Sequence, residues 1–105
     1  MTDANAAMAA VKEYQEGRQL RRRLSELSSK EIAERYGISV DRARAIGSGY
    51  TDTKITHDKL LEIRELYAEA ERIRPLVRQK SMNNLAAKYH LSKVTLRKYL
   101  DLSHG

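Results

Sequence analysis

Two stretches, Glu31-Ile-Ala-Glu-Arg-Tyr-Gly-Ile-Ser39 and Asn84-Leu-Ala-Ala-Lys-Tyr-His-Leu-Ser92, carry the same pattern 53 residues apart. Apolar and polar residues alternate in the same order in both. The matching positions are Ile32/Leu85, Ala33/Ala86, Arg35/Lys88, Tyr36/Tyr89, Ile38/Leu91, Ser39/Ser92 and Arg44/Arg97. Self-similarity at a fixed spacing indicates that one supersecondary unit is present twice.

The first copy carries the start and stop signals of two short helices around a tight turn. Ser28 followed by Glu31 is a capping box, which predicts a helix start. Gly37 predicts the end of that helix, because glycine adopts the left-handed conformation without steric cost. Ser39 then predicts the N-cap of a second helix, from Val40 to about residue 46.

The second copy repeats these signals with one difference. Ser81 predicts the start of its first helix, and Ser92 predicts the cap of a helix from Lys93 to about Leu100. His90 stands where the first copy has glycine. A histidine at positive φ is uncommon, so the sequence predicts a strained or slightly reshaped turn at this position.

A longer helical pattern precedes each copy. Thr56 predicts the N-cap of a helix with one apolar stripe, formed by Leu60, Ile63, Leu66, Tyr67, Ala70 and Ile73. Pro75 predicts the end of this helix or a kink in it. Residues 6–27 favour helix throughout, with Gly17 as a weak point.

The sequence therefore predicts a small all-α fold with two tandem helix-turn-helix units. Residues 1–47 would hold an N-terminal helix and the first unit, and turn-rich residues 48–55 would be a linker. Residues 56–105 would hold a long helix and the second, more basic unit. No segment predicts a strand, apart from a brief extended piece at residues 54–56.

Composition excludes several classes of protein. The chain has 105 residues, a formal net charge of +6 and no cysteine, so neither a disulfide scaffold nor a cysteine-based zinc site is expected. Its apolar stretches are far shorter than the roughly 18 to 20 residues that cross a bilayer. The N-terminus shows no secretory pattern. We therefore expect a cytoplasmic protein, associated with the nucleoid or present in a phage-infected cell, with no membrane partner.

Positive charge is concentrated in the second half of the chain. No acidic residue occurs between Glu71 and Asp101, whereas eight basic residues do. Such acid-free basic stretches within a foldable sequence are typical of proteins that bind polyanions.

The repeated unit resembles the helix-turn-helix of bacterial and phage DNA-binding proteins. The second copy, residues 85–99, is similar to the DNA-binding domain of serine resolvases and invertases, and the first to phage helix-turn-helix regulators. The resemblance covers about 20 residues in each copy. It implies that the second helix of each copy lies in the major groove of double-stranded DNA.

The resemblance also implies which residues contact DNA. The expected base contacts are Ser92, Lys93, Val94, Arg97 and Lys98 in the second copy and Ser39, Val40 and Arg44 in the first. The expected phosphate contacts are Arg35, Arg42, Lys88, Thr95, Arg72, Arg74, Arg78 and Lys80. Asp41 lies among the first copy's base-contact positions, where it would repel phosphate but accept a hydrogen bond from a cytosine amino group.

Catalysis and metal binding lack their usual residues. His57, His90 and His104 are isolated, and no glycine-rich phosphate loop or nucleophile elbow is present. We therefore expect neither an enzyme nor a cofactor, and predict a sequence-specific DNA-binding transcription regulator. One alternative is an oligomeric accessory protein in recombination or DNA packaging, self-associating through alanine-rich residues 4–14 or helix 57–73. Another is a protein-binding module such as an antitoxin.

Overall fold

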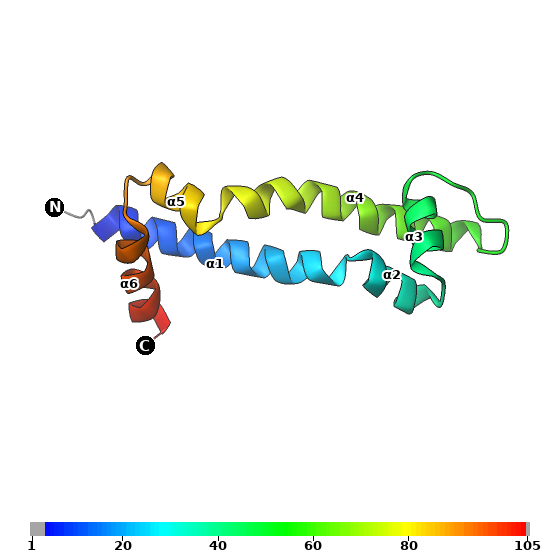
Figure 1. Ribbon diagram of the computed structural model, residues 1–105, viewed down its shortest axis with the longest axis horizontal. Coiled ribbons are helices and arrows are strands. Elements are labelled where there is room, and N and C mark those ends of the chain that lie inside the picture. Colours follow the sequence, from blue (N-terminus) through cyan, green and yellow to red (C-terminus); the bar gives the residue numbers. More distant parts are fainter. Residues whose placement is uncertain (1–3, 105) are drawn as a thin grey trace. The chain divides into compact units, whose positions relative to one another are not determined.

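The computed structural model describes residues 4–104 and consists of α-helices, with no strand among these residues. Figure 1 shows the helices in chain order. They are α1 (Ala4–Glu26), α2 (Ser29–Tyr36), α3 (Val40–Gly47), α4 (His57–Gln79), α5 (Met82–Lys88) and α6 (Lys93–His104). The predicted all-α class is confirmed, and residues 54–56 form no strand.

The chain forms two compact units. Unit 1 consists of the residues up to Arg21 together with those from Pro75 onward, and unit 2 consists of Arg22–Arg74. The boundaries fall inside α1 and α4, so each unit contains part of both long helices. This division differs from the predicted one, in which each half of the sequence forms its own unit.

In unit 2, the first helix-turn-helix packs on the start of α4 (Figure 1). Ile32 and Ala33 of α2, Ala43 and Ile46 of α3, and Leu60 and Ile63 of α4 form its buried core. Ala33 is 3% exposed, as expected for a small residue where two helices meet closely.

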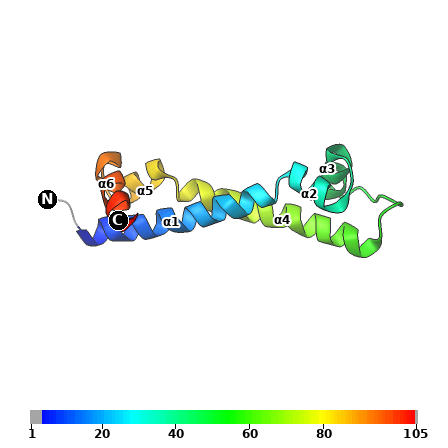
Figure 2. The same cartoon turned by 90° about the horizontal axis from the view of Figure 1, so that it is seen from below.

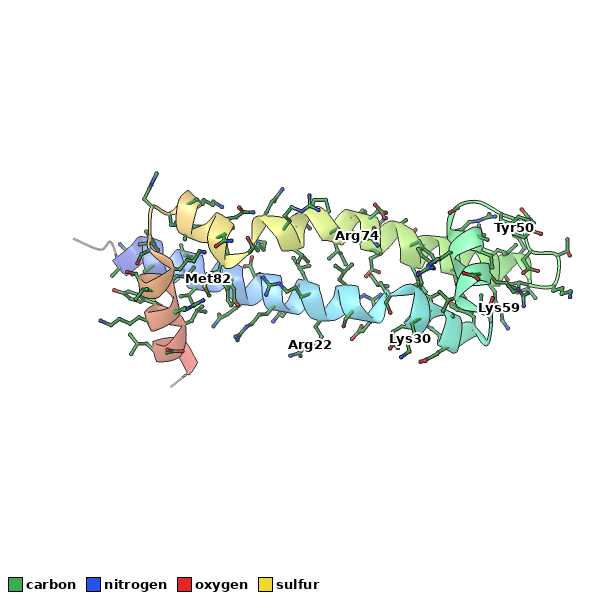
Figure 3. All side chains as sticks on the ribbon, in the orientation of Figure 1. Arg22, Lys30, Tyr50, Lys59, Arg74 and Met82 are labelled. Carbon is green, nitrogen blue, oxygen red and sulfur yellow. The ribbon has the colours of Figure 1, made fainter. Side chains whose placement is uncertain are left out.

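In unit 1, α5 and α6 pack on the start of α1 (Figure 2). The core contains Ala10 and Val11 of α1 with Leu85, Leu96 and Leu100. Met82, at the start of α5, packs against this core (Figure 3). Ala7 and Ala10, in the alanine-rich start of α1, are therefore buried within unit 1, whereas the alternative of self-association through residues 4–14 supposed that this stripe had no partner inside the chain.

The units differ from the predicted halves because each helix-turn-helix packs on the start of the other repeat's long helix, an arrangement that we call the exchange of helices. The 53-residue spacing relates α4 to α1 as well as the two helix-turn-helix motifs to each other. Each motif packs on the start of the long helix that belongs to the other repeat. Ala10 and Ile63 occupy equivalent positions, and both are fully buried. Neither repeat therefore contains the whole of its own core.

The predicted caps and turns are confirmed. The side chains of Ser28, Ser39, Ser81 and Ser92 each accept a hydrogen bond from the backbone N–H three residues later. Gly37 has φ 64°, and in the other copy the non-glycine residue His90 has φ 56°. Both turns thus use the left-handed conformation, although only one of them has the residue that favours it.

Helices α4 and α6 extend further than predicted. Pro75 does not end its helix, which was one of the two outcomes predicted, because α4 continues through it to Gln79. This proline is exposed. Before it in the chain, Ile73 is buried in unit 2, and after it Lys80 forms an ion pair with Glu13 in unit 1. Helix α6 continues past Leu100 to residue 104.

Gly17, predicted as a weak point of its helix, lies inside the continuous helix α1. It is buried within α1, and a Cβ atom added to it would lie 2.9 Å from Cβ of Lys80. The glycine therefore permits a close approach of the backbone near Lys80 within unit 1.

The segment predicted as a linker, residues 48–55, is part of unit 2. Asp52 is 9% exposed, accepts a hydrogen bond from the backbone N–H of Lys54, and forms an ion pair with Arg42 at 2.7 Å. The loop is thereby attached to α3 by polar contacts.

Candidate nucleic-acid interface

Helix α6 presents its predicted base-contacting residues to solvent. Lys93, Val94, Arg97 and Lys98 are all exposed, and the exposed fraction of Val94 reaches 76%. The same helix buries Leu96 and Leu100 in the core of unit 1. Packing thus fixes which face of α6 remains free for a partner.

Helix α3 has the corresponding arrangement in unit 2. Asp41 and Arg44 are exposed, whereas Ala43 and Ile46 are buried. Val40, a predicted base contact, is only partly exposed because it packs against the core. The accessible face of α3 is therefore narrower than the sequence predicted.

Arg64 of α4 holds the loop that follows α3, a role that the sequence analysis missed. Its guanidinium donates hydrogen bonds to the carbonyl oxygens of Ile46, Gly49 and Tyr50, at 3.2 to 3.3 Å. Tyr50 itself lies exposed on this loop (Figure 3). A single arginine within a helix gives no sequence signal for such contacts, because these carbonyl groups come close to Arg64 only when the chain folds.

The two predicted serine contacts are occupied as helix caps. Ser39 accepts from the N–H of Arg42 at 3.1 Å, and Ser92 accepts from the N–H of Thr95 at 3.1 Å. The Ser92 hydroxyl is also within hydrogen-bond distance of the Thr95 hydroxyl, at 2.8 Å. These serines position the first turns of α3 and α6.

Eight positions carry the same residue in both repeats, and the contacts of these residues show which of them stabilise the fold. These pairs are Tyr14/Tyr67, Glu16/Glu69, Arg21/Arg74, Ser28/Ser81, Ala33/Ala86, Tyr36/Tyr89, Ser39/Ser92 and Arg44/Arg97. Most have evident roles in caps, packing or ion pairs. For example, the Tyr36 hydroxyl donates to Glu62, and Glu69 pairs with Arg23 at 2.5 Å.

Arg44 and Arg97 are the exception. Both are exposed, and within residues 4–104 neither guanidinium forms an ion pair or a hydrogen bond. They occupy the same place on the second helix of each motif. Contacts among the described residues explain most of the other identical pairs but not this one.

Several predicted phosphate contacts are paired within the protein. Lys80 and Lys88 both bind Glu13, at 3.2 and 3.0 Å, and Lys80 also binds Glu16 at 3.1 Å. Arg42 is held by Asp52.

On α4, Arg72 pairs with Glu65 at 2.8 Å, and Arg74 pairs with Glu71. Both of these pairs are more than half exposed, so phosphate can replace the acid at little cost. Of the remaining candidates, Arg35 lies over the ring of Tyr36, at 5.8 Å.

Glu13 organises the electrostatics of unit 1. Its carboxylate accepts a hydrogen bond from the Tyr89 hydroxyl and binds Lys88 and Lys80, contacts that together lower the pKa of Glu13 from 4.5 to about 2. The Tyr89 hydrogen bond is the largest of these causes, and it also raises the pKa of Tyr89. Glu13 thus neutralises part of a basic run that looks uninterrupted in sequence.

Among the described residues, neither a membrane-spanning helix nor a cluster of metal-ligating side chains is found. None of the helices, over the part of the chain described, has the length and hydropathy needed to cross a bilayer. Over that same part, three or more His, Cys, Asp or Glu side chains never gather as a metal-binding group. The side chain of His104 lies outside the described set.

Comparisons with known proteins identify no relative. No protein-family model, curated protein or solved structure matches this chain. The chemistry of its own exposed residues is therefore the basis for a functional conclusion.

Proposed function

We propose that this chain is a sequence-specific double-stranded DNA-binding protein of the small transcription-regulator type. Helices α3 and α6 are its base-reading helices. The observation that carries this proposal is the pair Arg44 and Arg97, which are exposed, form no ion pair with the described residues, and are equivalent in the two repeats. Arginine at such a position can donate two hydrogen bonds to guanine in the major groove.

Charge supports the same assignment. The protein has a net charge of +6, and Lys93, Arg97 and Lys98 of α6 are exposed without ion-pair partners among the described residues. Electrostatic attraction to phosphates supplies most non-specific affinity for DNA. The burial of Ala7, Ala10 and Val11 weakens one argument for the alternative of an oligomeric accessory protein, which supposed that the alanine stripe had no partner inside the chain.

The test is binding to a pool of random-sequence duplex DNA, measured by fluorescence polarisation at about 50 and 200 mM salt, followed by sequencing of the bound fraction. For six or more phosphate contacts, the affinity falls roughly 10³-fold over this range. We also expect one DNA sequence motif to be enriched in the bound fraction. Absence of binding at the lower salt concentration would refute the proposal.

Single substitutions distinguish contacts to bases from general electrostatic attraction to the DNA phosphates. Arg44→Ala and Arg97→Ala each weaken binding to the selected site about 10-fold or more, through loss of a bidentate contact worth about 1–3 kcal/mol. Arg97→Lys keeps the salt dependence and loses discrimination at one base pair. Lys59→Ala and Lys12→Ala are the matched controls, since each removes one exposed charge from a long helix in unit 2 or unit 1. If the arginine variants behave like these controls, Arg44 and Arg97 do not read bases.

A further inference from the structure

The exposed faces of the two base-reading helices differ in chemistry although their arginines match. Asp41 in α3 is equivalent to Val94 in α6, and Ala45 is equivalent to Lys98. Asp41 and Val94 are both exposed. Two helices with the same fold and unlike side chains at the same positions do not present the same pattern to a base pair.

The charge on these faces differs as well. In α3, Asp41 offsets Arg44, and the neighbouring Arg42 is held by Asp52 at 2.7 Å. In α6, Lys93, Arg97 and Lys98 outnumber the single acid, Asp101. Attraction to phosphate is therefore stronger on the α6 side.

Lys93 lies where helix stability alone disfavours a cation. It is in the first turn of α6, which contains no acidic residue, whereas the first turn of α3 contains Asp41. A positive charge near a helix N-terminus is unfavourable by a few tenths of a kcal/mol or more. Such a local cost is expected where a residue serves binding.

Val94 is an apolar side chain that folding leaves uncovered. It is 76% exposed and lines a shallow hollow with Arg97, Lys98, Asp101 and Leu102, itself 66% exposed. A thymine methyl group in the major groove is an apolar partner of suitable size for a valine. At the equivalent position, the carboxylate of Asp41 is suited to a cytosine amino group.

From these differences we infer that the DNA target consists of two unlike half-sites, each with a guanine. The α6 half-site adds a thymine next to its guanine and supplies most of the salt-dependent affinity. The α3 half-site adds a cytosine and supplies more discrimination than affinity. This inference rests on the proposed DNA binding.

The experiment exchanges one residue between the two helices. The double variant Asp41→Val/Val94→Asp keeps the composition and net charge of the whole chain, and both positions are exposed. Wild type, the double variant and each single variant are taken through selection from random-sequence duplex DNA. Circular dichroism and thermal unfolding establish that every variant retains the wild-type fold.

We expect wild type to enrich two different half-sites, and the double variant to move the cytosine preference to the α6 half-site and the thymine preference to the α3 half-site. Asp41→Val alone makes the two half-sites more alike and strengthens binding about 10-fold or less, because it removes one carboxylate that repels the phosphates. A wild-type motif with two identical half-sites, or a single half-site, overturns the inference while leaving DNA binding intact. So does a motif that the exchange leaves unchanged in a folded protein. Absence of any salt-dependent binding overturns the proposed function itself.

Discussion

His90 shows how one residue departs from the pattern of its repeat. It has φ 56°, the conformation that Gly37 adopts at the equivalent turn with φ 64°. A side chain in this region costs about 1–2 kcal/mol because Cβ approaches the following carbonyl oxygen. The fold accepts this cost at one of two equivalent turns.

We expect His90→Gly to raise the free energy of unfolding by about 1 kcal/mol, since it removes that steric cost. Thermal or urea unfolding measures the change. His90→Ala is the matched control and gains little, because alanine keeps the Cβ atom. Gly37→Ala lowers stability by about 1 kcal/mol, and it does so through backbone strain, since no atom lies within 4 Å of the added Cβ. Equal effects of glycine and alanine at position 90 would contradict this explanation.

Glu13 links stability to pH. Its pKa falls from 4.5 to about 2 on folding, so the folded state favours the charged carboxylate. The resulting stabilisation is complete above about pH 4.5 and disappears as the pH falls towards 2.

Glu13→Gln is therefore expected to lower the free energy of unfolding by about 2 kcal/mol near pH 7. The difference from wild type shrinks between pH 4.5 and pH 2, and urea unfolding across that range measures it. Glu34→Gln, at an exposed site with no ion pair among the described residues, serves as control. A difference independent of pH would mean that the Glu13 contacts contribute no charge-dependent stability.

At the scale of elements, α4 is a continuous helix that contains an exposed proline. Pro75 has no N–H to donate to the carbonyl of Glu71 four residues earlier, and its ring crowds that carbonyl. A proline in a helix interior costs about 3 kcal/mol relative to alanine. Packing and ion pairs on either side keep the helix intact despite this cost.

Pro75→Ala is expected to stabilise the protein by about 1–3 kcal/mol, because it restores a backbone hydrogen bond and removes no buried contact. Thermal unfolding measures the gain, and slower amide exchange near residue 75 localises it. Gln79→Ala, at an exposed position in the same helix, provides a control with an effect below about 0.5 kcal/mol. Loss of stability in Pro75→Ala would show that the proline is needed for the conformation of α4.

At the scale of the whole molecule, each core is built from both repeats. The start of α1 completes the core with α5 and α6, and the start of α4 completes the core with α2 and α3. The repeats therefore depend on each other for folding, even though each contains a full set of helix signals.

Cutting the chain between its repeats tests this dependence. A protease site inserted between the exposed residues Tyr50 and Thr51 allows the folded protein to be cleaved in the loop after α3. We expect the two fragments to elute together and to keep their helical circular dichroism, because each core still contains parts of both. When the fragments are separated in denaturant and each is then diluted out of it alone, we expect little helix. Mixing the two fragments is expected to restore the helical signal. Fragments that fold independently as monomers would contradict the exchange.

The local features of this protein follow from its sequence. Serine caps, the turn at Gly37, the unusual residue at His90 and the apolar stripe of α4 depend on neighbours in the chain, so spacing alone predicts them. The exposed positions of Arg44 and Arg97 follow from the same helical period. The all-α class was predictable for this reason.

Only the tertiary structure decides how these elements combine. Gly17 near Lys80, Asp52 with Arg42, and Glu13 with three partners are contacts between residues that become neighbours on folding. The exchange of helices has the same origin, because an apolar stripe specifies that a face must be buried but not which partner covers it. The alanine-rich start of α1 is the clearest case, since its partner lies in the other repeat.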